Sequence, residues 1–254
     1  MAFPDRRPTP DALPWARGAA PLPELVRGRI RLGGGLAEAP ALPRLATGIG
    51  EVDRLLGGGF PRGRLSEITG PPSSGRTSLA LALATTALDA GELVAWVDAA
   101  DALDPASLEA SAGDPKRLLW VRAPGVLEAL RSAERLLAAG GFALVVLDLL
   151  AKGRFPLDAH VWMRLARGAS ASGTALALLG RERRIGPFAT LVVDLRATRV
   201  HFAANPAWLE GLTTRVELVR HRLGVAEGFV PVCWKVPPVV RDPSVRRSRD
   251  PDAA

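Results

Sequence analysis

The chain has 254 residues and a formal net charge of +7, with 33 Lys and Arg against 26 Asp and Glu. Because 48% of its residues are hydrophobic and 23% are charged, it can bury a full core, which disfavours a disordered or fibrous protein. The length fits one domain with appended tails, or at most two domains.

The cysteine count and the lengths of the apolar runs favour a cytoplasmic location. Cys233 is the one cysteine of the sequence, so an intramolecular disulfide is excluded and a reducing compartment is favoured. No apolar run reaches the roughly 18 to 20 residues of a membrane helix, and the first residues lack the apolar stretch of a signal peptide. We therefore expect a soluble, cytoplasmic protein without a membrane partner.

The basic residues are almost all arginines, since lysine occurs at positions 116, 152 and 235 alone. A basic surface attracts polyanions, so nucleic acid is one candidate class of partner. Codon bias toward Arg, Ala and Leu explains the same composition equally well. Both interpretations stay open at this point.

Composition divides the chain into three parts. Residues 1–44 contain eight prolines and a run of three glycines, which predicts an arm or linker. Residues 237–254 are rich in Pro, Arg and Asp and predict a flexible basic tail. The core domain is therefore expected over residues 45–236.

Short apolar runs alternate with amphipathic stretches through most of the core. Strands are expected at 64–69, 93–98, 118–123, 143–150 and 174–180, and helices at 77–90, 126–139 and 159–171. This alternation predicts an α/β fold with a mainly parallel central sheet flanked by helices. Three further runs, at 190–202, 213–221 and 228–236, have no helices between them and predict an antiparallel C-terminal extension of that sheet.

A glycine-rich segment between the first of these strands and the first helix has the pattern of a phosphate-binding loop. Backbone N–H groups of such a loop, together with the positive end of the following helix, bind phosphate, and the final hydroxyl binds Mg²⁺. The nucleotide-binding candidates are Gly70, Pro71, Pro72, Ser73, Ser74, Gly75, Arg76 and Thr77.

Arg76 stands where this pattern has lysine. A guanidinium is planar and bulkier than an ammonium, so it can pair with phosphate without lying where charge develops during phosphoryl transfer. Nucleotide binding is thus easier to retain than hydrolysis. The alternative is that the segment is a structural turn that binds nothing.

The strand that ends in Val145-Val146-Leu147-Asp148 supplies a second component of such a site. An acid at the carboxyl end of a strand commonly holds the magnesium shell, so Thr77 and Asp148 are the candidate Mg²⁺ residues, with ATP as the implied nucleotide. No further metal is expected, because His160, His201 and His221 are scattered along the sequence without the spacing of metal ligands.

Several motifs together resemble the RecA recombinase family. Ala46-Thr47-Gly48-Ile49, Asp53-Arg54-Leu55-Leu56-Gly57-Gly58-Gly59 and Pro61-Arg62-Gly63-Arg64 lead into the phosphate loop. The likeness continues in residues 97–105, where the chain reads VDAADALDP, and resumes in residues 188–196 and 213–219. The resemblance implies a RecA-like P-loop core.

Two positions depart from the family pattern in ways that concern hydrolysis. The resemblance implies a water-activating glutamate at the position of Ala100, and alanine cannot accept a proton. It also implies a γ-phosphate-sensing glutamine at the position of Arg181. Together with Arg76, these departures predict a degenerate P-loop ATPase with weak or no hydrolysis, and no confident catalytic residue.

The resemblance also implies two DNA-binding loops, which are short in this chain. Their basic residues give the DNA-binding candidates Lys152, Arg154, Arg181, Arg183 and Arg184. Charge without length can contact a phosphate backbone but does not readily thread between stretched bases. A solvated basic loop without a ligand is the alternative.

Within the family, the chain is most similar to the ImuA group, RecA-like accessory proteins of the translesion DNA synthesis mutasome. This likeness implies a role in the DNA damage (SOS) response and in mutagenic DNA synthesis. The implied partners are a Y-family polymerase paralogue, RecA, or both, with single-stranded DNA as a further ligand. Two alternatives remain, namely a DNA-stimulated ATPase of the RecA superfamily and a plain nucleic-acid-binding protein.

Overall fold

The alternating strands and helices expected from the sequence are present in the computed structural model, which describes residues 42–104, 115–150, 158–203, 208–224 and 227–235. The strands are β1 (Arg44–Leu45), β2 (Phe60–Pro61), β3 (Leu65–Thr69), β4 (Leu93–Asp98), β5 (Leu118–Arg122), β6 (Phe142–Asp148), β7 (Ala175–Gly180), β8 (Leu191–Phe202), β9 (Leu209–His221) and β10 (Gly228–Lys235). The helices are α2 (Gly50–Leu55), α3 (Arg76–Asp89), α5 (Val126–Ala139) and α6 (Ala159–Ser172), with short 3-10 turns η2 (Pro115–Arg117) and η3 (Gly186–Phe188).

The main sheet has eight strands within the described residues, in the order β10-β9-β8-β3-β7-β6-β4-β5. The strands from β8 to β5 are mutually parallel, whereas β9 and β10 are antiparallel to their neighbours. The predicted parallel sheet and its antiparallel C-terminal extension are both confirmed.

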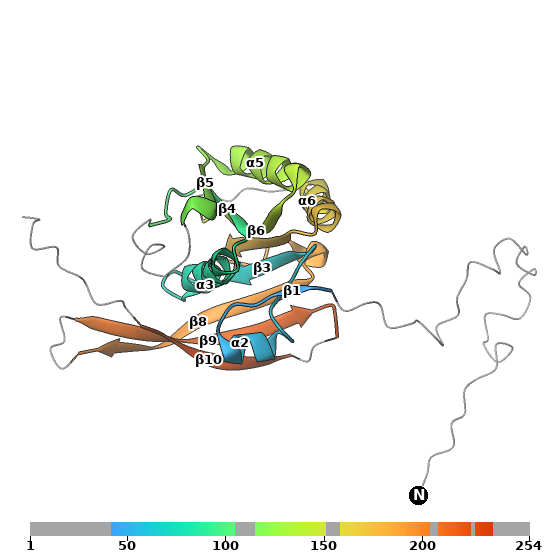
Figure 1. Ribbon diagram of the computed structural model, residues 1–254. Helices are drawn as coiled ribbons and strands as arrows, with labels where there is room; N and C mark the ends of the chain where they lie inside the picture. Colours follow the sequence, from blue (N-terminus) through green and yellow to red (C-terminus); the bar gives the residue numbers. More distant parts are fainter. Residues whose placement is uncertain (1–41, 105–114, 151–157, 204–207, 225–226, 236–254) are drawn as a thin grey trace, which may run out of the picture. The chain divides into compact units, whose positions relative to one another are not determined.

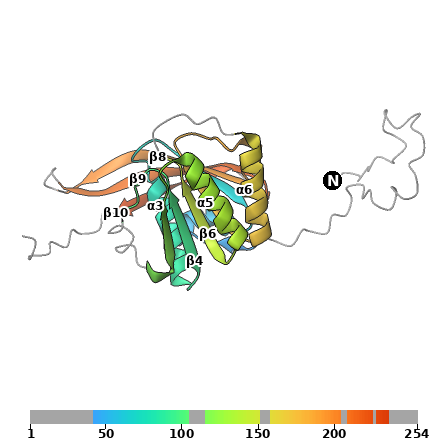
Figure 2. The same cartoon turned by 90° about the horizontal axis from the view of Figure 1, so that it is seen from above.

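Helices cover both faces of this sheet (Figure 1). On one face α3 packs over the central strands and α2 packs near β10, so that Leu79, Leu83 and Val52 are fully buried. On the other face α5 and α6 lie side by side (Figure 2) and bury Leu165 and Leu137. Both faces of the central strands are therefore apolar, as parallel sheets require.

The carboxyl ends of four parallel strands meet at one edge of the sheet. Thr69 of β3 pairs with Gly180 of β7, and Asp148 of β6 pairs with Asp98 of β4. In open α/β sheets ligands bind beyond this edge, because the loops that leave the strands converge there. The segments that follow β3, β4, β6 and β7 thus form the candidate site.

A short element before the sheet was not predicted from the sequence. Strands β1 and β2 pair antiparallel around α2, and the carboxylate of Asp53 in α2 accepts hydrogen bonds from Thr47 N (2.7 Å), Thr47 Oγ1 (2.8 Å) and Gly48 N (3.2 Å). With so few residues in each piece, hydrophobic periodicity gives no signal there.

Strands β8 and β9 continue past the parallel strands as a ribbon (Figure 1), and β10 flanks this ribbon as far as the pair Lys235–Gly211. The ribbon carries large apolar side chains that are about half exposed, namely Val200 (49%), Phe202 (55%) and Leu209 (48%). Exposed apolar residues that adjoin one another mark interaction surfaces more often than scattered ones do.

The predicted arm and tail fall almost entirely outside the described residues. Residues 237–254 are not described, and of the arm only 42–44 are, where Arg44 begins β1. Among the described helices, none combines the length and the apolar character needed to cross a membrane.

Candidate nucleotide site and basic loop

The predicted phosphate loop connects β3 to α3, and its two glycines occupy positions that a side chain would not fit. Gly75 precedes α3 in the left-handed region (φ +88°), and a Cβ atom there would lie 2.5 Å from Trp234 Nε1. A Cβ atom on Gly70 would collide with the carbonyl oxygen of Leu195. The narrow backbone path inferred from the sequence is thus enforced by close neighbours.

Those neighbours come from strands far along the chain. The hydroxyl Oγ1 of Thr214 in β9, which is fully buried, donates to the carbonyl oxygen of Ser74 (2.9 Å). Trp234 in β10 packs against Gly75. Strands β9 and β10 therefore hold the loop in place, a contact that local sequence patterns cannot reveal.

Arg76 lies inside the loop and is only 7% exposed. Its Nη1 donates to the carbonyl oxygen of Gly70, whereas its Nε and the Oγ of Ser74 are buried with no hydrogen-bond partner among the described residues. Burial lowers the pKa of Arg76, and the charge of Arg181 lowers it further, while Asp148 opposes both effects. A buried cation with an unused donor can bind an anion more strongly than an exposed one.

The start of α3 is also suited to an anion. Its N-cap residue, Gly75, provides no side-chain acceptor, and its first turn contains no acidic residue. The N–H groups of this turn are therefore free of competing carboxylates, and the helix dipole favours negative charge there. Together with the buried Arg76, these features fit the phosphates of a nucleotide, which Gly70 to Thr77 would hold.

Asp148 occupies the predicted place at the end of β6 and is 1% exposed. Burial raises the pKa of Asp148 to about 6, and the charge of Asp98 adds to this, while the Leu150 N–H (3.0 Å to Oδ1) and Arg76 oppose it. No cluster of three or more His, Cys, Asp or Glu occurs in the described ranges. Mg²⁺ usually takes one or two protein ligands plus phosphate and water, so Thr77 and Asp148 would be the residues to hold it beside a bound nucleotide.

Replacing Asp148 by asparagine should increase the free energy of unfolding at pH 7 while weakening Mg²⁺-dependent nucleotide binding. In the folded state the pKa of Asp148 is about 6, above its ordinary value of 3.8, so folding is favoured while the carboxyl group is protonated. This contribution to the free energy of unfolding is lost as the pH rises from about 4 through about 6. The full shift of the Asp148 pKa corresponds to about 3 kcal/mol of unfolding free energy.

Urea unfolding of both proteins at pH 4, 5, 6 and 7 measures this effect, and the advantage of Asp148→Asn should grow across the series. Asp101→Asn is the control, because Arg122 lowers the pKa of Asp101 and that variant should gain nothing. A stability difference that is constant with pH would contradict the prediction.

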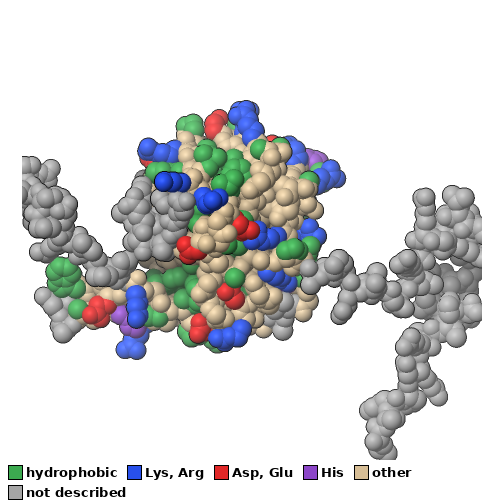
Figure 3. Space-filling model, in the orientation of Figure 1, with side chains coloured by type: hydrophobic (Ala, Val, Ile, Leu, Met, Phe, Trp, Pro, Cys, Tyr) green, Lys and Arg blue, Asp and Glu red, His purple; other side chains and the backbone are tan. Residues whose placement is uncertain are grey.

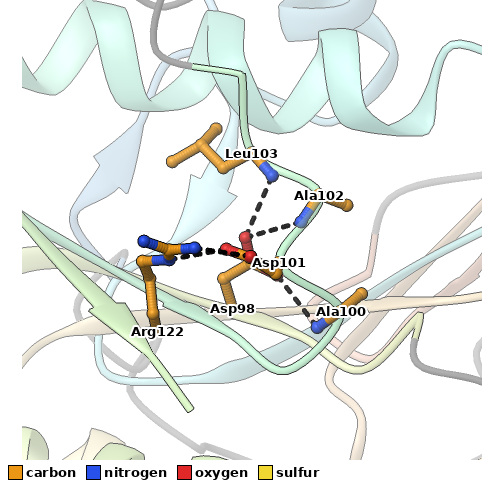
Figure 4. A network of polar contacts seen from close by, with 6 residues as sticks. All are labelled: Asp98, Ala100, Asp101, Ala102, Leu103 and Arg122. Carbon is orange, nitrogen blue, oxygen red and sulfur yellow. Dashed lines mark hydrogen bonds and ion pairs between the residues drawn. The ribbon is translucent and has the colours of Figure 1, made fainter. Parts of the chain in front are cut away.

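The turn after β4 contains Ala100, and its two nearest carboxylates are both engaged (Figure 4). Asp98, which is fully buried, accepts from the N–H groups of Ala100 (3.0 Å), Ala102 (2.9 Å) and Leu103 (2.9 Å). Asp101 forms a two-bond ion pair with Arg122, each bond being 2.6 Å long. Both acids thus make structural contacts within or beside the turn that contains Ala100.

The arginines of the basic segment after β7 lie near two different parts of the molecule. The charge of Arg181 acts on Arg76 of the phosphate loop, whereas Arg183 lies near Glu67, on the face of the sheet that packs with α6. Arg184 joins the segment to the sheet through its backbone N–H, which donates to Glu67 (2.5 Å). Lys152 and Arg154, the other two DNA-binding candidates, lie outside the described residues.

Basic side chains do not form one continuous patch on the face drawn in Figure 3, where Lys and Arg alternate with Asp and Glu. The +7 charge alone therefore does not locate a nucleic-acid surface on that face.

Comparison with known proteins gives consistent matches. The family described as RecA N-terminal domain matches residues 28–155, just over half of the chain. The RecA protein of Rubrobacter xylanophilus is 32% identical, over 76% of this chain and 65% of that protein. The RecA protein of Treponema pallidum is 43% identical, over 42% of this chain and 26% of that protein. The chain thus spans less than two thirds of the length of these relatives.

Among solved structures, the RadB recombinase is similar in fold. The match has a TM-score of 0.60 at 24% identity and covers 76% of this chain and 96% of that chain. The α/β architecture described above is thus that of a RecA-like core.

Proposed function

Since this chain belongs to the RecA family, we propose that it is a RecA-like accessory protein of the DNA damage response and of translesion DNA synthesis. It binds a nucleotide at the phosphate loop, hydrolyses it slowly or not at all, and acts through contacts with proteins and single-stranded DNA. The observation that carries the proposal is a well-formed phosphate loop beside a turn whose catalytic position is Ala100.

The geometry of the loop supports nucleotide binding. Arg76 is buried and has an unpaired donor, and the N-terminus of α3 faces the loop without a capping side chain. When bound, Mg²⁺ would neutralise phosphate charge, with Thr77 and Asp148 holding it. Arg76 and the loop backbone would orient the phosphates.

The turn after β4 supports the loss of hydrolysis. General-base catalysis needs an acceptor within hydrogen-bond reach of the attacking water, and in this turn Asp98 is buried and already accepts three N–H groups. Asp101 is held by Arg122, away from that role. Loss of a positioned base typically costs a factor of about 100 to 10,000 in rate.

The β8–β9 ribbon supports a role in protein contacts. Val200, Phe202 and Leu209 are about half exposed and adjoin one another, since Phe202 pairs with Leu209. Burial of such side chains against a partner gains about 25 cal/mol per Å² of apolar surface. We assign this ribbon to the Y-family polymerase paralogue or to RecA.

Equilibrium titration of a fluorescent ATP analogue with and without Mg²⁺, alongside phosphate release with and without single-stranded DNA, tests the nucleotide part. We expect saturable binding and phosphate release at background. Release that rises with DNA and disappears in Asp148→Asn would identify a DNA-stimulated ATPase instead. Absence of binding would show that the loop is only a structural turn.

The protein-contact part is tested with purified RecA and a purified polymerase paralogue. The double variant Val200→Ser with Phe202→Ser should weaken the contact at least about tenfold, because it removes two apolar anchors. Its nucleotide affinity should be unchanged. Wild-type protein that neither binds the polymerase nor alters RecA filament assembly would refute the accessory role.

A further inference from the structure

Glu67 is a buried carboxylate in the middle of β3, three residues before the phosphate loop. Its exposed fraction is 1%, and its strand neighbours are Leu178 of β7 and Val192 of β8. A carboxylate in such apolar surroundings is costly unless it accepts hydrogen bonds, so its partners indicate what it does.

Those partners belong to the basic segment after β7. A single oxygen, Oε1, accepts from the backbone N–H groups of both Arg184 (2.5 Å) and Ile185 (3.3 Å). Burial raises the pKa of Glu67, while these two bonds and the charges of Arg183 and Arg220 oppose the increase. Glu67 thus fixes the backbone at the point where the arginines diverge from the sheet.

Packing and polar contacts together hold the segment in this position, since Ile185 is 1% exposed within the apolar core on the α5–α6 face of the sheet. A cavity of about 90 Å³ lies beneath it, lined in part by Glu67, Gly186 and Val219. The Nη1 of Arg220 donates to the carbonyl oxygen of Gly186, which gives the segment a second polar attachment. Because this pocket leaves part of the segment without tight packing, the hydrogen bonds to Glu67 and Arg220 act with the buried Ile185 to fix its backbone.

We propose that Glu67 is a positioning residue for DNA binding, which holds the Arg184–Ile185 backbone so that Arg183 and Arg184 are presented together to a phosphodiester backbone. The proposal rests on the single-stranded DNA contact proposed above. Arg183 is exposed and Arg184 is half-buried. Fixing such side chains before binding reduces the entropy lost on association.

Two single substitutions separate position from charge. Glu67→Gln removes the charge but keeps an oxygen that can accept both N–H groups at the place of Oε1. Glu67→Asp keeps the charge but withdraws the oxygen by one methylene. Glu134→Asp, in an exposed ion pair with Arg164 (2.8 Å), is the control for the same shortening elsewhere.

Binding of a fluorescent oligo-dT to the full chain, measured across a salt series, is the readout. Glu67→Gln and the control should bind within about twofold of wild type. Glu67→Asp should bind about tenfold more weakly, with a slope of log affinity against log salt shallower by up to about 1.4, because two phosphate contacts contribute about 0.7 each on single strands. Hydrogen exchange at the Arg184 and Ile185 amides should accelerate in Glu67→Asp alone.

Each contrary outcome has a distinct meaning. If wild type binds no oligo-dT, the DNA contact and this inference both fail. If wild type binds but Glu67→Asp keeps its affinity and salt slope, only the role of Glu67 is refuted. Weak binding by Glu67→Gln with normal binding by Glu67→Asp would show that the charge acts instead of the position, which also overturns the inference.

Discussion

Replacing Asp98 by alanine should lower the free energy of unfolding by about 4 kcal/mol. Asp98 is fully buried, and its carboxylate accepts three backbone N–H groups of the turn that follows β4. Each N–H left without an acceptor costs about 1 to 3 kcal/mol. Urea unfolding of the purified variant measures the loss, which should appear as a lower midpoint with an unchanged slope.

Asp98→Asn provides the graded comparison. Oδ1 serves Ala100 while Oδ2 serves both Ala102 and Leu103, so an asparagine cannot supply acceptors for all three. Its loss should lie between zero and that of alanine. A loss below about 1 kcal/mol for Asp98→Ala would mean that water or a rearranged backbone replaces the carboxylate.

Replacing Arg76 by alanine should weaken nucleotide binding by about 100-fold. Hydrogen bonds to a charged group contribute about 1.5 to 3 kcal/mol, and a factor of 100 corresponds to about 2.8 kcal/mol. Arg76 is the buried cation of the phosphate loop and has an unused donor at Nε. Titration of the fluorescent ATP analogue at fixed Mg²⁺ measures the change.

Arg76→Lys is the matched variant, because it keeps a positive charge on a shorter and more compact group. It should retain affinity within about tenfold of wild type, and ATP should still raise the midpoint of thermal unfolding. Alanine and wild type binding equally well would contradict the assigned role of Arg76. In that case Arg76 would serve only as a donor to the Gly70 carbonyl.

The sheet was largely predictable from the sequence, because its strands are long apolar runs separated by amphipathic helices. The run at 143–150, for example, became β6 at Phe142–Asp148, and the stretch at 77–90 became α3 at Arg76–Asp89. The antiparallel end of the sheet was equally visible, since no helix lies between β8, β9 and β10. Periodicity carries this information locally, within each element.

Long-range contacts at the site were not predictable in the same way. Glu67 reads as an ordinary strand residue, and its burial under Arg184 depends on a partner 117 positions away. The placement of Trp234 against Gly75 depends on the register of β10 with β9. A single sequence contains no record of such pairings, so the motif located the loop but not the residues that support it.

The bond from Thr214 to Ser74, with Trp234 packed on Gly75, also sets the order in which the molecule becomes functional. During synthesis the ribosome releases Ser74 of the phosphate loop 140 residues before Thr214 of β9, and domains emerge from their amino end first. A chain truncated before residue 209 retains every residue of the phosphate-loop motif but lacks strands β9 and β10, which contact the loop. The nucleotide binding proposed for this loop would therefore be acquired last, once the sheet is complete.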